Sequence, residues 1–459
     1  MRGRSSPSHG LAHCGPSRTG RWSHGPLSTQ TVEGSITVTL ELTTRRVLAN
    51  HLDHPKNLTE HEDNFGAIGG LAISIAVLRE SGITGRGGAA FPTAKKVEFL
   101  LQQRRATRYV VVNAMEGEPA AHKDRMLLAT NPHLVLDGAM VLANLLNADS
   151  VIVCIAREHV KTIAQVKAAI AQRGAKRLQG PSFEVQSPPG RYVAGEESAL
   201  VHWLNNNETL PQYRPTRPSI LQIGRGGVLL DNAETHANIG LIARHGAEWF
   251  RSVGTATRPG TTVTSVTGNG KALVVEVPYG TPIRSILVGA GITYEPRALL
   301  LGGYGGTWLD GKHLDVGFDD DSLRPFGAGT GAGVIMALPH ESCGVAECAR
   351  IVDYMAKESA RQCGPCAFGL PAMAEDLKAL ASGRNATQSL ARLSSRSDVV
   401  EGRGACRHPD GVIRFVRTAL NVFAEDFNHH AAGHPCQFAQ SPRVSYIPHQ
   451  SDVKDLEWE

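Results

Sequence analysis

A glycine-rich loop that runs into a predicted helix is the first segment whose residues could bind a ligand. Its sequence, Gly85-Arg-Gly-Gly-Ala-Ala-Phe-Pro-Thr-Ala-Lys-Lys96, joins three glycines to two lysines. Glycines let backbone amides approach a phosphate or a flat ring, and a helix N-terminus adds partial positive charge. The loop matches neither the Rossmann fingerprint nor the P-loop. Alone, it is more typical of an ordinary turn than of a nucleotide site.

Two further segments place carboxylates next to predicted element ends. Asn113-Ala-Met-Glu-Gly-Glu-Pro119 follows a predicted strand, and ligands of open α/β sheets bind beyond the carboxyl ends of strands. Tyr192-Val-Ala-Gly-Glu-Glu-Ser-Ala-Leu200 puts paired acids before helical spacing, where the helix dipole alone favours them. The first segment also fits a solvated acidic loop. Each segment therefore indicates binding only in combination with the others.

Cysteines crowd the last part of the chain. Six of the eight lie between Cys343 and Cys436, which favours a local metal or cluster site over a disulfide framework. Cys363-Gly-Pro-Cys366 precedes one predicted helix and Cys406 another, an arrangement that can hold an iron–sulfur cluster. A C-x-x-C pair also fits zinc or a redox dithiol. No histidine has the zinc-finger spacing, and no βαβ pattern surrounds the pair.

Strands and helices alternate in the first half of the chain. Tyr109–Asn113 and Ser150–Ile155 are short apolar runs that predict buried strands. Leu134–Leu146 and Val160–Arg173 carry helical spacing. Such alternation predicts an α/β domain with a parallel sheet.

The hydrophobic period then changes to two. Thr262–Thr267 and Ala272–Val277 predict strands joined across Asn269-Gly270, a strong hairpin signal. A short helix at Pro282–Gly289 and a strand at Ala298–Leu301 follow. The order hairpin, helix, strand predicts a small module like a β-grasp domain.

Beyond residue 340 the chain is predicted to be helical. Apolar residues repeat at three and four within Val345–Met355, Leu370–Leu380 and Val412–Val422, and more weakly around Leu390. These segments predict a bundle of about four helices.

Composition excludes several classes of protein. The 459 residues suit about three domains, and no apolar run approaches a membrane-spanning helix. With 41% hydrophobic and 20% charged residues, the chain is not wholly disordered. The net charge of +4 comes from four arginines in the first thirty residues, so the body has no general bias toward nucleic acid. We expect a cytoplasmic protein with no direct membrane insertion.

The segments above, taken in order, resemble the flavin- and NADH-binding subunit of respiratory complex I and its diaphorase relatives in hydrogenases and formate dehydrogenases. The similarity runs from about Ser81 to His429. Its segments are Ser81-Gly-Ile-Thr-Gly-Arg-Gly-Gly-Ala-Ala-Phe-Pro-Thr, Glu116-Gly-Glu-Pro, Lys123-Asp-Arg, Tyr192-x-x-Gly-Glu-Glu, Asp231-Asn-Ala-Glu-Thr, Glu358-Ser and Cys363-x-x-Cys366.

The resemblance implies an α/β fold with a Rossmann-like FMN-binding domain, a β-grasp domain of the soluble-ligand-binding type, and a C-terminal four-helix bundle that carries an iron–sulfur cluster. The expected divisions are a disordered basic tail at 1–33, the FMN and NADH domain at 34–255, the β-grasp domain at 256–338, the helical domain at 339–436 and a loose tail at 437–459. An organellar transit peptide or a misplaced start codon are alternatives for the basic tail.

The resemblance also implies which residues bind the cofactors. NADH would stack over FMN, with Glu118 near its ribose and nicotinamide and with Phe91 and Phe99 near the adenine. No side chain would be catalytic, because the flavin carries the chemistry. The remaining expected cofactor-binding residues are Gly85, Arg86, Gly87, Gly88, Lys96, Asn113, Glu116, Tyr192, Gly195, Glu196, Glu197 and Asn232; the expected metal ligands are Cys363, Cys366 and Cys406.

The flavin site departs from the family pattern at three positions. Met115 replaces an acidic residue, which removes a polar contact worth about 1 to 3 kcal/mol. Asp231 stands where the family has the first Asn of an Asn-Asn pair. Arg217 takes the place of an aromatic residue on the nucleotide side, where it could stack on adenine or meet an extra phosphate.

The cluster motif departs further. Ala360 stands at the position of the family's first cysteine ligand. Cys343 or Cys348 could replace that ligand, although cysteine is also a common buried residue. The alternatives are a [4Fe–4S] cluster, a labile three-cysteine form and an empty site.

We interpret the chain as an FMN-dependent, NADH-oxidising electron-transfer subunit. Its expected partners are NADH and either a ferredoxin-like or [2Fe–2S] protein or a membrane oxidoreductase complex, at which the protein would be peripheral. NADPH, the direction of electron flow and the identity of the acceptor stay open. The alternative is a non-catalytic scaffold of the same fold that binds a partner and has lost its cluster.

Overall fold

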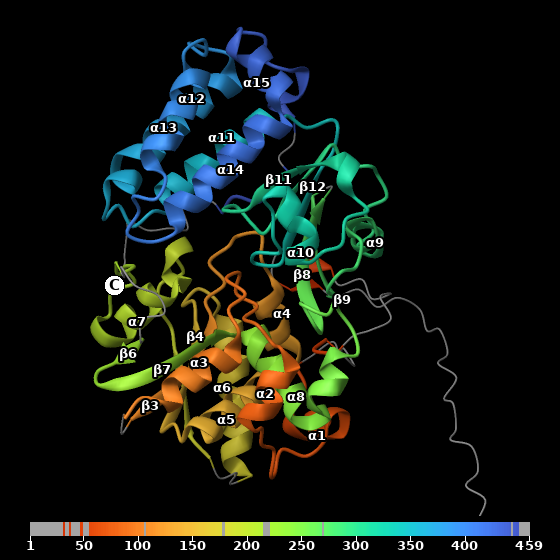
Figure 1. The fold of residues 1–459 in the computed structure, drawn as a ribbon, viewed down its shortest axis with the longest axis vertical. Coiled ribbons are helices and arrows are strands. Elements are labelled where there is room, and N and C mark those ends of the chain that lie inside the picture. The colour runs from red at the N-terminus through yellow and green to blue at the C-terminus, as the bar shows by residue number, and fades with distance from the viewer. Residues whose placement is uncertain are drawn as a thin grey trace, which may run out of the picture.

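The computed structural model describes residues 31–32, 36–37, 46–48, 55–104, 107–176, 180–213, 221–268, 270–441 and 444–448. Two sheets and a group of helices follow one another along the chain. Figure 1 shows the last helices at one end of the molecule and the first sheet at the other, with the second sheet beside them.

The first sheet has five strands. They are β3 (Arg108–Ala114), β4 (Ser150–Ile155), β5 (Ser182–Gln186), β6 (Gln222–Ile223) and β7 (Gly226–Asn232), in the spatial order β5-β4-β3-β7-β6. β3 runs parallel to β4 and β7, β4 runs parallel to β5, and β6 is antiparallel to β7. The predicted parallel sheet is confirmed, and both predicted strands lie within β3 and β4.

Helices cover both faces of this sheet. They are α1 (Leu58–Phe65), α2 (Ile75–Ser81), α3 (Thr93–Leu101), α4 (Lys123–Thr130), α5 (Pro132–Leu146), α6 (Val160–Ala175), α7 (Glu197–Asn206) and α8 (Ala233–Arg251). A 3-10 turn, Tyr192–Gly195, precedes α7. The predicted helices at 134–146 and 160–173 are confirmed by α5 and α6.

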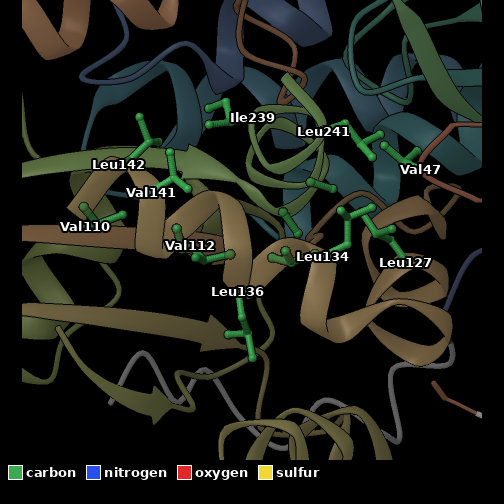
Figure 2. Close-up of a cluster of buried hydrophobic side chains, with 14 of the residues drawn as sticks. Val47, Val110, Val112, Leu127, Leu134, Leu136, Val141, Leu142, Ile239 and Leu241 are labelled. Atoms are coloured by element: carbon green, nitrogen blue, oxygen red, sulfur yellow. The ribbon is translucent and has the colours of Figure 1, made fainter. Parts of the chain in front are cut away.

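Alternation along β3 separates two hydrophobic cores. Val110 and Val112 face the larger core together with Leu134 and Val141 of α5 (Figure 2). Val111 faces the opposite side, where it packs in a cluster that includes Leu200 of α7. The end of β3 is thereby held rigidly from both faces, which is what a ligand site at its carboxyl edge requires.

The second sheet has seven strands in the order β1-β2-β9-β8-β12-β10-β11. Its strands are β1 (Thr31–Val32), β2 (Ile36–Thr37), β8 (Thr261–Gly268), β9 (Lys271–Pro278), β10 (Ala298–Leu301), β11 (Thr307–Asp310) and β12 (Val334–Leu338); α9 (Ile283–Gly289) and α10 (Asp320–Leu323) accompany them. β8 and β9 form the predicted antiparallel hairpin. Asn269 of its turn lies outside the described residues, as does the predicted basic tail except for β1.

The last region consists of α11 (Gly344–Lys357), α12 (Leu370–Ser382), α13 (Ser389–Val400), α14 (His408–Val422) and α15 (Ala424–Ala431), with a short π-helical turn at Pro365–Gly369. The four predicted helical segments are confirmed by α11 to α14. The sequence analysis missed α15, because its eight residues contain one large apolar side chain, Phe427, too few to show a helical period.

The chain after α15 folds back over α11. The backbone amides of Val444 and Ser445 donate to the buried Glu347 carboxylate at 3.0 and 3.2 Å. A 3-10 turn at Gln437–Gln440 precedes this contact. The sequence predicts a loose tail from 437 on; its described residues pack instead, because Glu347 supplies acceptors for their amides.

No single helix among the described residues is long and apolar enough to cross a membrane. α4 and α5 reach that length and composition as a pair, but they meet at a bend of 98°. Nearly all of α5 is buried in the core, which accounts for its apolar sequence.

Candidate functional site

A cavity of about 570 Å³ lies where β3 and β7 end. Its volume falls within the range of about 300 to 1,000 Å³ that cofactor sites occupy. Its walls come from the glycine loop, α3, both strand ends and the start of α7. The lining residues are Gly85, Gly87, Ala89, Ala90, Phe91, Lys95, Lys96, Phe99, Leu100, Asn113, Gly195, Glu196, Glu197, Leu221, Val228, Leu230, Asp231, Asn232 and Arg407.

The glycine loop is closed and anchored by its own backbone. Gly85 donates its amide to the carbonyl of Phe91 at 2.9 Å, and Gly88 has a φ of +109°, which L side chains rarely adopt. The amide of Arg86 donates to Thr235 Oγ1 at 2.9 Å. The loop is therefore held against the start of α8 with Gly85 and Gly87 facing the cavity.

Lys96 ties α3 to the end of β7. Its ammonium donates to Asp231 Oδ1 and to the carbonyl of Leu230, both at 2.8 Å. Burial opposes the charge of Lys96, but the adjacent Asp231 carboxylate outweighs it and raises the lysine pKa. Asp231 Oδ2 is buried and has no hydrogen-bond partner among the described residues. This acceptor on the cavity wall fits a donor group of a bound ligand.

Asn113 connects the end of β3 to the turn before α7. Its amide group donates to the carbonyl of Gly195 at 2.8 Å, and its oxygen accepts from the amide of Met115 at 3.2 Å. A Cβ atom at Gly195 would lie 3.2 Å from that of Met115. Met115 is buried in the apolar cluster beneath the turn, so the residue that departs from the family pattern serves as packing.

The paired acids before α7 have different tasks. The Glu196 carboxylate caps α7 by accepting from the amides of Ser198 and Ala199 at 2.8 and 3.1 Å. The helix-dipole explanation of this acid is thus confirmed. Both Glu196 and Glu197 also line the cavity, so the structural role does not exclude a binding role.

Glu116 and Asn232 belong to a buried polar network under the cavity. The Glu116 carboxylate accepts from the amide of Asp124 at 2.8 Å and from Arg125 Nε at 3.1 Å. Asn232 donates to the Asp124 carboxylate at 3.2 Å and caps α8 by accepting from the amide of Thr235. Asn232 lines the cavity, whereas Glu116 is turned toward the start of α4.

Glu118 lies where all three regions meet. Its carboxylate accepts from the amide of Tyr304 at 2.8 Å and from the Tyr192 hydroxyl at 3.1 Å. Burial raises the pKa of Glu118 to about 7. Tyr192 in turn donates its amide to Glu358 of the helical region at 3.1 Å. Neither Glu118 nor Tyr192 lines the cavity; both join its floor to the other two regions.

Three cysteine thiols gather in the helical region. Burial raises the pKa of Cys366, and the neighbouring thiols of Cys363 and Cys406 raise it further. Cys366 also contacts the hydroxyl of Ser359. Burial raises the pKa of Cys406 to about 11, with a further contribution from the Glu196 carboxylate on the cavity wall. Three thiols next to the cavity suit the thiolate ligation of an iron–sulfur centre.

Two family models match the chain. The Nuo51 FMN-binding domain matches residues 78–241, and the iron–sulfur binding region of NADH-ubiquinone oxidoreductase F matches residues 346–430. Together they cover more than half of the chain. The chain belongs to the family of complex I flavoprotein subunits.

Individual relatives agree with this family. The F subunit of NADH-quinone oxidoreductase from Streptomyces coelicolor is 28% identical over 411 residues, which are 86% of this chain and 91% of the relative. The second of the F subunits of this enzyme in Rhizobium meliloti is 28% identical over 378 residues, 79% of this chain and 90% of the relative.

Solved structures of NAD+-reducing [NiFe]-hydrogenase are also similar. The H2-reduced state matches with a TM-score of 0.71 and 25% identity over 79% of this chain and 62% of the hydrogenase chain. The air-oxidized state matches with a TM-score of 0.69 and 26% identity over 88% and 67% of the two chains. The chain thus spans about two thirds of the hydrogenase chain that it matches.

The structure separates the residues that the family pattern assigns to cofactors. Ten reach the cavity wall: Gly85, Gly87, Phe91, Lys96, Phe99, Asn113, Gly195, Glu196, Glu197 and Asn232. The others, Arg86, Gly88, Glu116, Glu118 and Tyr192, lie behind it. The Arg86 guanidinium lies over the Tyr279 ring at 4.5 Å, so it fixes the loop to the second sheet. Arg217 lies outside the described residues.

Some wall residues were missed from the sequence. Asp231 was noted as a departure from the family but not as the partner of Lys96. Arg407 reaches the cavity from the helical region, one residue after Cys406. Its position beside a proposed cluster ligand was the available signal.

The two substitute cluster ligands have other neighbours. Cys343 Sγ lies 3.6 Å from His430 Nε2, in one group with Cys436. Cys348 is buried beside Trp308. Replacement of the missing ligand by either cysteine stays a prediction.

Proposed function

We propose that the protein is an FMN-dependent NADH dehydrogenase subunit that passes electrons to iron–sulfur centres of a larger complex. One observation carries the proposal. Every residue that lines the cavity, except Arg407, lies within the segment 78–241 that matches the FMN-binding domain of the family. The cavity and the family model therefore identify the same part of the chain independently.

The wall residues fit an anionic, flat cofactor. Bound FMN would accept a hydride from NADH and release electrons one at a time. Lys96 would place its positive charge next to that cofactor, and Asp231 Oδ2 would accept a hydrogen bond from it. Phe91 and Phe99 offer ring faces on the same wall, where an adenine can stack.

The exit for electrons follows from the position of Cys406. Arg407 contributes to the cavity wall and Glu196 acts on the Cys406 thiol, so the thiol group adjoins the cavity. Cys363, Cys366 and Cys406 would hold the cluster, and the segment matched by the iron–sulfur model contains all three. Neither match nor geometry favours the scaffold alternative.

The finer assignments complete this proposal. The chain divides into an FMN and NADH domain, a β-grasp domain and a four-helix iron–sulfur domain near residues 255 and 338. Electrons leave to a ferredoxin-like or [2Fe–2S] partner or to a membrane oxidoreductase complex, at whose cytoplasmic side the protein is peripheral. The similarity to subunits of NADH-quinone oxidoreductases and to a hydrogenase supports both choices of partner.

Flavin content tests the proposal. Protein purified anaerobically should release one FMN per chain on acid precipitation, and NADH should bleach the bound flavin. Lys96→Ala should weaken FMN binding about 10- to 100-fold, because it removes a charged hydrogen-bond donor and leaves Asp231 unpaired. The measurement is flavin fluorescence during titration of apoprotein.

Lys95→Ala is the matched control. Lys95 lines the same cavity but makes no ion pair with Asp231, so its loss should cost FMN binding much less. A protein that neither contains nor takes up FMN refutes the function. Equal losses in the two variants would remove Lys96 from its role.

A further inference from the structure

We infer that Cys343, His430 and Cys436 form a binding site for a single Zn²⁺ ion, separate from the iron–sulfur thiols. The two sulfurs and the imidazole nitrogen all lie within 4.8 Å of one another. Cys343 and His430 are fully buried and Cys436 is partly exposed. Two thiolates and one imidazole form a donor set that zinc prefers, with a fourth tetrahedral position left for water or another small ligand from solvent.

The partners of His430 determine its tautomer. Nδ1 lies 2.9 Å from the carbonyl oxygen of Leu380, which can only accept, so Nδ1 carries the proton. Nε2 accepts from the backbone amide of Cys436 at 3.0 Å, so its lone pair faces the two thiols. A hydrogen bond from the other ring nitrogen to a carbonyl is how zinc-bound histidines are usually oriented. A cation would take the lone pair in place of the Cys436 amide.

Cys343 is placed to serve as a thiolate. It is the N-cap of α11, and its sulfur accepts from the amide of Ala346 at 3.4 Å. The positive end of the 14-residue helix favours a negative sulfur there. The three ligands thus come from the start of α11, the end of α15 and the chain that follows α15.

The site would fasten the C-terminal segment to the first helix of its region. Cys436 begins the stretch that continues to Val444 and Ser445, whose amides bind Glu347 of α11. A shared ion at the other end of this stretch closes it against α11. Metal binding would then stabilise the folded helical region, as it does in structural zinc sites.

Element-specific measurements on the full-length protein test the site. Anaerobically purified wild-type protein, supplied with Zn²⁺, should hold one zinc per chain by mass spectrometry. Its zinc-edge X-ray absorption should show two sulfur and two nitrogen or oxygen neighbours. Iron in the cluster does not interfere with this signal. Three sulfur neighbours would place the zinc in the cluster thiols and overturn the proposal.

Variants assign the ligands. Cys436→Ser, at a partly exposed position, should weaken zinc binding by more than the roughly 10- to 100-fold that loss of an outer hydrogen bond costs. His430→Gln should do the same, and a chelator should lower the melting temperature of the wild type but not of Cys436→Ser. Cys406→Ser is the control and should keep its zinc.

Three results would overturn the site. They are a wild-type protein without stoichiometric zinc, unchanged zinc affinity in folded Cys436→Ser, and a Cys343–Cys436 disulfide in protein prepared anaerobically. Circular dichroism establishes that each variant is folded. None of these results depends on FMN binding, so the site and the proposed function fail separately.

Discussion

The flavin cavity and the thiol groups of the helical region are built in different ways. Around the cavity, each polar wall residue already has protein partners: Lys96 pairs with Asp231, and Asn113 holds Gly195. In the helical region, the cysteines of the two groups face mainly one another, burial raises the pKa of Cys366, and Cys406 follows it. The first site is assembled by the protein alone, whereas the second brings thiols together that only a metal can satisfy as thiolates.

This difference determines how each site responds to a substitution. A cavity wall with many independent contacts loses affinity gradually, because each group contributes about 1 to 3 kcal/mol. A cluster held by three thiolates has no redundancy, so the loss of one ligand removes the centre. We therefore expect graded effects in the cavity and all-or-none effects among the thiols.

The largest expected effect is that of Cys406→Ser. The variant should lose nearly all of its iron, because two thiolates from one turn cannot hold the cluster alone. It should keep FMN and still reduce it with NADH in a single turnover, since Cys406 does not line the cavity. Iron analysis and anaerobic stopped-flow absorbance measure the two quantities.

Cys348→Ser is the matched control for this variant. Cys348 is buried beside Trp308, and iron should stay unless Cys348 is the substitute ligand. Ala360→Cys restores the family's first ligand and should raise iron content and its resistance to oxygen. Full iron in Cys406→Ser would show that the cluster is held elsewhere.

Local patterns predicted most of the fold. The apolar runs gave β3 and β4, and Asn269-Gly270 marked the β8–β9 hairpin, because both signals depend on neighbours in sequence. α15 was not predicted, since Phe427 alone shows no period. Its stability comes from tertiary packing, which a sequence window does not contain.

The candidate sites divide along the same line. Motifs a few residues long brought the cavity residues to attention, and the fold then joined them. The zinc group could not be found from spacing, because Cys343 lies 87 residues before His430. Glu116 and Glu118 show the reverse case: their motif is conspicuous, but their carboxylates bind backbone amides behind the cavity wall.

A medium effect is expected at Glu118, which joins the cavity floor to the other regions. Its pKa of about 7 in the folded protein lies above the ordinary value of 4.5. The folded state therefore holds a proton between these values that the unfolded state releases, so stability falls as pH rises from about 4.5 to 7 and is then constant. Glu118→Gln should remove this loss and stabilise the protein above pH 7 by about 1 to 3 kcal/mol.

Chemical unfolding at several pH values measures this difference. The amide oxygen of glutamine can still accept from Tyr304 and Tyr192, so the variant keeps the local contacts. FMN should stay bound, and reduction by NADH should slow if Glu118 faces the nicotinamide side. A parallel loss of flavin and of NADH affinity would contradict the separation of wall from floor.

The smallest expected effect is that of Arg407→Ala, which tests where the two regions meet. Arg407 lines the cavity from the helical region, but 77% of its side chain is exposed and it pairs with Asp410 at 2.9 Å. Because exposed charge interactions are worth up to about 1 kcal/mol, NADH affinity should fall no more than about fivefold, and the loss should vanish at high salt. Arg403→Ala, in the same loop and exposed, is the control. A larger loss that resists salt would mean that the helical region helps to bind the dinucleotide, so that the cavity would no longer be assembled by the first region alone.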